Sequence, residues 1–176
     1  MMRFLIVTLL SFVSAMVTVA AIGRDDIPRV RTTDRQIRAL LDEGLAHSPS
    51  LRALVGRLAR GDVVVYLRCA RLSPRLDGQL TFVSAAGGFR YVLVHLAIDR
   101  PWARQIATLG HELQHAVEIA ERPDIVDQAA LARAYTRIGF VRPARQHGHR
   151  SFDTMAAIFA GEQVRREILR SSTAED

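Results

Sequence analysis

Apolar residues recur along the chain with two periods, one typical of helices and the other of strands. Ile37, Leu40 and Leu41 share one face of a helix, and Thr33-Asp34-Arg35-Gln36 before them has the form of a capping box. The same criterion, together with the positions of proline, predicts five helices. The first is 34–46, the second begins at Ser48-Pro49-Ser50, and the third begins at Pro101 and ends before Pro123. The last two are 125–137 and 152–169.

Between the second and third of these helices the pattern becomes that of a sheet. Val63–Leu67 is apolar and β-branched, which predicts a buried strand, and Leu80–Ala85 and Phe89–Ile98 predict two more. Ala86-Gly87-Gly88 predicts a hairpin turn, because glycine takes positive φ without steric cost. The fold class expected is α+β, a small three-stranded, largely antiparallel sheet packed against helices, with Gly139–Arg150 as a loop.

The N-terminus has the pattern of an export signal. Arg3 precedes an apolar run from Phe4 to Ile22, which gives way to polar residues after small side chains at Ala20 and Ala21. The run of about 19 residues is also just long enough to span a bilayer. We therefore expect residues 1–21 to be a signal peptide or an N-terminal membrane anchor, and residues 22–176 to form a single exported domain, periplasmic or secreted.

Composition narrows the class of protein further. The 176 residues carry a formal charge of +6, but every one of the 24 basic residues is arginine. The absence of lysine and the small number of aromatic residues argue against nucleic-acid binding. Phosphate-binding proteins usually combine lysine with arginine, and single-strand binding uses aromatic platforms. The single cysteine, Cys69, excludes an intramolecular disulfide and a cysteine-rich zinc module.

The chain contains one motif typical of metal binding, H-E-x-x-H, in the middle of a predicted helix. Its residues are His111-Glu112-Leu113-Gln114-His115. Residues i and i+4 lie on one helical face, so both imidazoles can reach one Zn²⁺ ion. Glu112 then lies beside the metal, where it can take a proton from the attacking water as the catalytic base. Gly110 is expected to allow a close approach of the backbone on the side that faces the sheet.

The segment Gly110–Val117 resembles the active-site helix of the zincin metallopeptidases, especially the thermolysin-like gluzincins with their His-Glu-Leu-Thr-His-Ala-Val. The resemblance implies a minimal zincin-like fold and a zinc-dependent peptidase. The glycine and third histidine of metzincins are absent after the motif. Gluzincins take their third ligand from a glutamate on a downstream helix, and the matching residue here is Asp153, which opens the last predicted helix.

Alternatives remain for the third ligand. Asp153 has a purely structural interpretation as a carboxylate in the first turn of a helix, and Arg150 or Arg165 can compete for it. Glu118 is three residues after His115 on the same face, but one straight helix rarely supplies three ligands to one ion. We therefore expect Glu118 to hold an imidazole rather than to bind the metal.

The remaining polar candidates have simpler interpretations. His147 and His149 are expected to be solvated, His95 to be a hydrogen-bonded core residue, and Glu162 to be exposed. Either Tyr135 or Tyr91 has a hydroxyl suited to polarise a scissile carbonyl, but the sequence places neither.

The sequence therefore favours an exported zinc metallopeptidase that binds a peptide or protein substrate along the edge strand of its sheet. Membrane contact is expected only through residues 4–22, if these stay attached. The alternative is a zincin-like domain that binds metal or a partner without catalysis.

Overall fold

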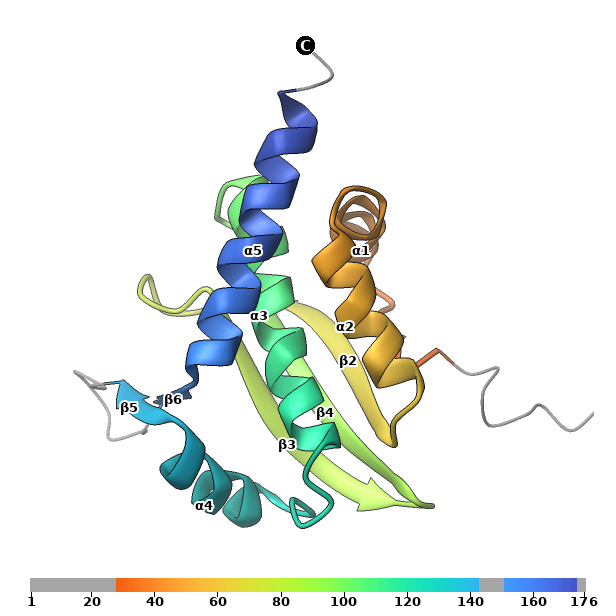
Figure 1. Cartoon of the computed structure of the whole chain (residues 1–176), viewed down its shortest axis with the longest axis vertical. Helices are drawn as coiled ribbons and strands as arrows, with labels where there is room; N and C mark the ends of the chain where they lie inside the picture. Colours follow the sequence, from red (N-terminus) through yellow and green to blue (C-terminus); the bar gives the residue numbers. More distant parts are fainter. Residues whose placement is uncertain (1–27, 143–150, 174–176) are drawn as a thin grey trace, which may run out of the picture.

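The structure is a computed structural model that describes residues 28–142 and 151–173. Figure 1 shows a sheet with helices on one face and a smaller unit at one side. The predicted export segment, His147, His149 and Arg150 lie outside the described residues. Within the described ranges no helix is both long enough and apolar enough to span a bilayer.

The sheet has four strands in the order β1-β2-β4-β3. They are β1 (Val30–Arg31), β2 (Val63–Ala70), β3 (Gly78–Ala86) and β4 (Phe89–Ala97). β1, β2 and β4 run parallel, and only β3 is antiparallel to its neighbour β4. The expected α+β class is confirmed, but the three-stranded, largely antiparallel sheet was wrong.

Burial explains the strand order. Alternate residues of β4 are almost inaccessible, whereas most residues of β3 are exposed or half-buried. The more apolar second strand of the hairpin therefore takes the centre, beside β2, and the more polar first strand becomes the edge. The turn between them has the expected glycine geometry, with φ of 59° at Gly87 and 75° at Gly88. β1 escaped prediction because two residues within a polar segment show no alternation.

Helices cover one face of the sheet (Figure 1). They are α1 (Arg35–His47), α2 (Pro49–Ala59), α3 (Trp102–Ala120) and α5 (Met155–Ser172), and all four contribute to one hydrophobic core. Asp34, not Thr33 as the capping-box pattern suggested, caps α1 by accepting from the N–H groups of Gln36 and Ile37. Ser48 caps α2 in the same way.

α3 is the central helix, packed between the sheet and α5 (Figure 1). The close approach expected at Gly110 is to α5 and not to the sheet, since a Cβ there would lie 2.7 Å from Cγ2 of Val164. Gly161 on α5 makes the reciprocal approach, because a Cβ there would lie 3.2 Å from Cβ of His111. Two glycines thus bring α5 tightly against the part of α3 that carries His111.

The C-terminal end of α3 is fixed by the buried guanidinium of Arg90 on β4. This group donates to the carbonyls of Ile119, Arg122 and Ile125 and forms a two-point ion pair with Asp62. Helix carbonyls at a C-terminus have no partner within the helix, and a cation satisfies them especially well. Arg90 therefore fixes both the end of α3 and the segment that leads into the next helix.

The smaller unit consists of α4 (Gln128–Ile138) and the hairpin of β5 (Phe140–Arg142) and β6 (Ser151–Asp153). Part of the expected loop Gly139–Arg150 is thus a strand. The last helix begins at Met155 with Thr154 as its cap, so Asp153 lies in β6 rather than in the first turn expected for it. A Cβ at Gly139 would lie 2.4 Å from the carbonyl oxygen of Asp153, so a glycine is required where α4 meets β6.

Candidate metal centre

The two motif histidines lie on one face of α3, with their ring centroids 4.9 Å apart and their planes nearly perpendicular. His115 is buried, whereas the side chain of His111 keeps 21% of its surface exposed. The helical spacing therefore places the two rings next to each other, and access to solvent is on the His111 side.

Asp153 joins the two histidines from a different element. Its Oδ1 lies 3.4 Å from Nε2 of His111 and 3.7 Å from Nε2 of His115. One ligand atom from each of the three residues lies within 4.8 Å of the others. The N–H of Thr154 donates to the same Oδ1 at 2.8 Å, which fixes the direction of the carboxylate. The structure thus brings together all three residues that the sequence nominated as ligands.

This donor set could hold a metal ion, and its donor types are among those that zinc takes. Donor atoms bound at about 2.0–2.2 Å in a tetrahedron lie about 3.4 Å from one another, which is close to the spacing between Asp153 and the two imidazoles. Two imidazole nitrogens and one carboxylate oxygen also leave one position open, as in catalytic zinc sites. The same atoms form ion pairs when the imidazoles are protonated.

Glu118 holds His115 rather than completing the ligand set. Its Oε2 accepts a hydrogen bond from Nδ1 of His115 at 2.9 Å. A carboxylate can only accept, so the proton lies on Nδ1 and Nε2 is the nitrogen with a lone pair for a metal. This is the arrangement in which a partner outside the ligand set fixes the tautomer and orientation of a metal-binding histidine.

Two further side chains hold Glu118, and sequence reasoning gave neither of them this role. The hydroxyl of Tyr135 on α4 donates to Oε2 of Glu118 at 2.7 Å, and that of Thr154 donates to Oε1 at 2.6 Å. The Tyr135 oxygen also lies 3.0 Å from Nδ1 of His115. No periodic pattern connects these residues, because they meet only when α4 and the start of α5 pack beside α3.

The electrostatics of the cluster follow from this bonding. Burial alone would lower the pKa of His115, but the hydrogen bond to Glu118 and the nearby carboxylates of Glu112, Glu118 and Asp153 outweigh burial and raise that pKa. Burial alone would raise the pKa of Glu118, but hydrogen bonds from His115, Thr154 and Tyr135 lower it. Burial and the adjacent Glu118 charge raise the pKa of Tyr135, which therefore stays a hydrogen-bond donor.

Glu112 points towards the edge strand of the sheet. It is buried, and an added Cβ at Gly78 on β3 would lie 2.7 Å from its Oε1. Any larger residue at position 78 would displace the Glu112 carboxylate or the methyl group of Thr108, which lies equally close. Glycine at the start of β3 thus lets the carboxylate lie directly against the strand.

Several other candidates lie elsewhere. His95 and Tyr91 are only half-buried, on the face of the sheet opposite the helices, where Tyr91 stacks on Tyr66; the expectation of a core His95 was therefore wrong. Glu162 is exposed, and so is Arg165.

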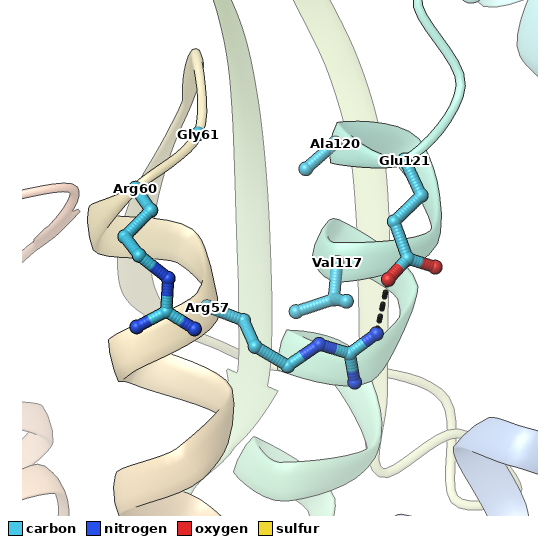
Figure 2. A pocket seen from close by; sticks show the side chains of 6 residues that line it. All are labelled: Arg57, Arg60, Gly61, Val117, Ala120 and Glu121. Carbon is cyan, nitrogen blue, oxygen red and sulfur yellow. Dashed lines mark hydrogen bonds and ion pairs between the residues drawn. The ribbon is translucent and has the colours of Figure 1, made fainter.

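An open pocket of about 300 Å³ between α2 and α3 is lined by Arg57, Arg60, Gly61, Val117, Ala120 and Glu121 (Figure 2). An ion pair between Arg57 and Glu121 crosses it, and no member of the histidine cluster lines it.

Comparisons of the chain with protein-family models, with curated proteins and with solved structures found no match.

Proposed function

We propose that this chain is an exported zinc-dependent metallopeptidase. The observation that carries the proposal is the convergence of His111, His115 and Asp153 from two distant segments, beside a buried glutamate that lies against an edge strand. A chance H-E-x-x-H on a surface helix needs neither the third donor nor the hydrogen bonds around it.

The roles of the residues follow from their positions. His111, His115 and Asp153 would hold the ion, and Glu118 keeps the proton of His115 on Nδ1. A bound zinc ion supplies a Lewis acid for the scissile carbonyl and for the attacking water. Glu112 takes one proton from that water as its oxygen bonds to the carbonyl carbon, and delivers the proton to the nitrogen as the C–N bond breaks.

The substrate class is suggested by what lies next to Glu112. β3 is an edge strand, and an extended peptide can add to such an edge through backbone hydrogen bonds. Gly78 brings the start of this edge against the proposed base, so a peptide paired there would present a carbonyl close to Glu112. Export is proposed from residues 1–21 alone, whose basic start and apolar run are typical of a signal peptide or an anchor.

The competing proposal is a domain that binds metal without catalysis. It accounts for the three donors but gives no reason for a buried carboxylate at position 112, since a closed structural site takes four protein ligands. The two proposals differ in a single variant. Glu112→Gln leaves the three donors in place and keeps the side-chain volume, so it should retain zinc and lose most hydrolysis.

The test begins with metal content. The purified chain should hold about one equivalent of zinc, and His111→Ala or His115→Ala should abolish stoichiometric binding. Hydrolysis of a mixed peptide library, measured by mass spectrometry, should require both zinc and Glu112. Unchanged metal content in the histidine variants would show that the cluster is not a metal site. Zinc binding without hydrolysis would favour the non-catalytic domain.

A further inference from the structure

α4 lies against the edge of the sheet and is anchored at both of its ends. The segment that precedes it is held by Arg90, which donates to the carbonyls of Arg122 and Ile125. Its C-terminal half is held by the Tyr135 hydroxyl, which donates to Glu118. α4 contacts β3 as well, so the position of its first residues relative to the strand is fixed by the fold (Figure 1).

The direction of the backbone groups of β3 follows from its pairing. Ala97 donates its N–H to the carbonyl of Asp77 at 2.8 Å, so the backbone groups of Asp77 face β4. Directions alternate along a strand, so the N–H and C=O groups of Gly78, Leu80 and Phe82 point to the outer edge. The register of β3 shifts between Phe82 and Ser84, so a peptide that adds to the regular part of the strand before this shift pairs with these outward groups.

One of the outward groups already has a partner. The N–H of Phe82 donates to the side-chain oxygen Oε1 of Gln128, the first residue of α4, at 3.0 Å. Gln128 thus occupies the hydrogen-bonding position that the next residue of an added peptide would need.

We propose that Gln128 ends the docking edge of β3, so that a substrate peptide is recognised over only about three residues on that side of the cleaved bond. The proposal rests on the function proposed above and adds to it a specificity-determining residue. Pairing begins at Gly78, beside Glu112, and stops after Leu80. An antiparallel peptide, the slightly more stable arrangement, would run from Phe82 towards Gly78, so its restricted side is the N-terminal one.

Peptides of graded length test this proposal. One series is lengthened a residue at a time on the N-terminal side of a single cleavable bond, and a second series on the C-terminal side as a control. With the zinc-loaded wild-type chain, kcat/KM should stop rising in the N-terminal series beyond about the third residue. Gln128→Ala should let it rise further, about fivefold for each newly formed pair of backbone hydrogen bonds. The proposal would be overturned if kcat/KM kept rising along the N-terminal series in the wild type, or if the length at which it stops rising were the same in Gln128→Ala.

A second measurement does not depend on activity. Amide hydrogen exchange should show Phe82 protected in the wild type and exchanging about tenfold faster in Gln128→Ala. Gln128→Glu keeps an oxygen acceptor at the same place and should restore both the protection and the plateau. Equal exchange at Phe82 in wild type and Gln128→Ala would refute the role of Gln128 even if no peptide is cleaved. If Phe82 is protected as expected but no peptide is cleaved, the result would count against the proposed peptidase function and not against the blocking of the β3 edge by Gln128.

Discussion

Glu118→Gln is the sharpest test of how the cluster is organised, because it removes a charge and changes no shape. The carboxylate accepts from His115 and Tyr135 on one oxygen and from Thr154 on the other, all within 2.9 Å. An amide has one oxygen and one NH₂ group, so it can serve only one of these two sides.

The structure indicates which side keeps its acceptor. If the amide oxygen faces His115 and Tyr135, two donors are satisfied and only the Thr154 hydroxyl must turn away, which it can do because it is able to accept from the NH₂ group. The reverse orientation would set the NH₂ group against two donors. The first orientation should therefore prevail, with a loss of about 1–2 kcal/mol in the unfolding free energy of the metal-free chain, because buried charge-assisted bonds are replaced by neutral ones.

Zinc affinity should fall as well. Glu118→Gln keeps an oxygen acceptor for His115 but removes the negative charge that makes the imidazole a more basic ligand, and changes of this kind typically weaken metal binding about 10- to 100-fold, or about 1.4–2.7 kcal/mol. Competition with a chromogenic chelator measures the affinity, and urea unfolding in EDTA measures the stability of the metal-free chain. Glu121→Gln is the matched control, because Glu121 directly follows the same helix, is exposed, and pairs with Arg57 outside the cluster.

An unchanged zinc affinity in Glu118→Gln would refute the reasoning that the charge of this carboxylate strengthens zinc binding by His115. A complete loss of zinc with intact folding would show instead that Glu118 is itself a ligand. In that case Asp153→Asn should retain zinc.

Three further predictions rest on separate contacts. Asp153→Asn should weaken zinc binding more than Glu118→Gln does, by over about 100-fold in the same chelator assay, because the charge is lost from a ligand itself and not from the residue that holds a ligand. Arg90→Met should lower the unfolding free energy measured in urea by about 3 kcal/mol, because it leaves the buried carbonyls of Ile119 and Ile125 without this donor. Arg104→Met, which breaks a more exposed pair with Asp77, should cost under about 1 kcal/mol. Burial alone would raise the pKa of Glu167, but hydrogen bonds from Ser48, Gln163 and Ser50 lower it, so its contribution to stability is complete above about pH 5 and is lost as pH falls through the folded pKa. The stability gap between wild type and Glu167→Gln should accordingly narrow on acidification, and a gap that widens would contradict this assignment.

Local patterns were enough to predict the elements whose signal repeats along the chain. The helices around Leu40, Leu54 and Leu113 and the hairpin at Gly87 lie where the spacing of apolar residues and the glycines put them. The proximity of His111 and His115 also follows from sequence alone, because residues four apart on a helix are neighbours whatever surrounds them.

Tertiary packing decided the rest. The pairing of β4 with β2 depends on which strand of the hairpin is buried, and β1, β5 and β6 are too short to show a period. The position of Asp153 depends on Gly139, which lets α4 lie against β6, and that of Thr154 and Tyr135 around Glu118 depends on how α4 and α5 pack on α3. A sequence therefore determines which side chains one helix presents, but contacts between residues far apart in the chain exist only once the core has fixed the positions of the elements that carry them.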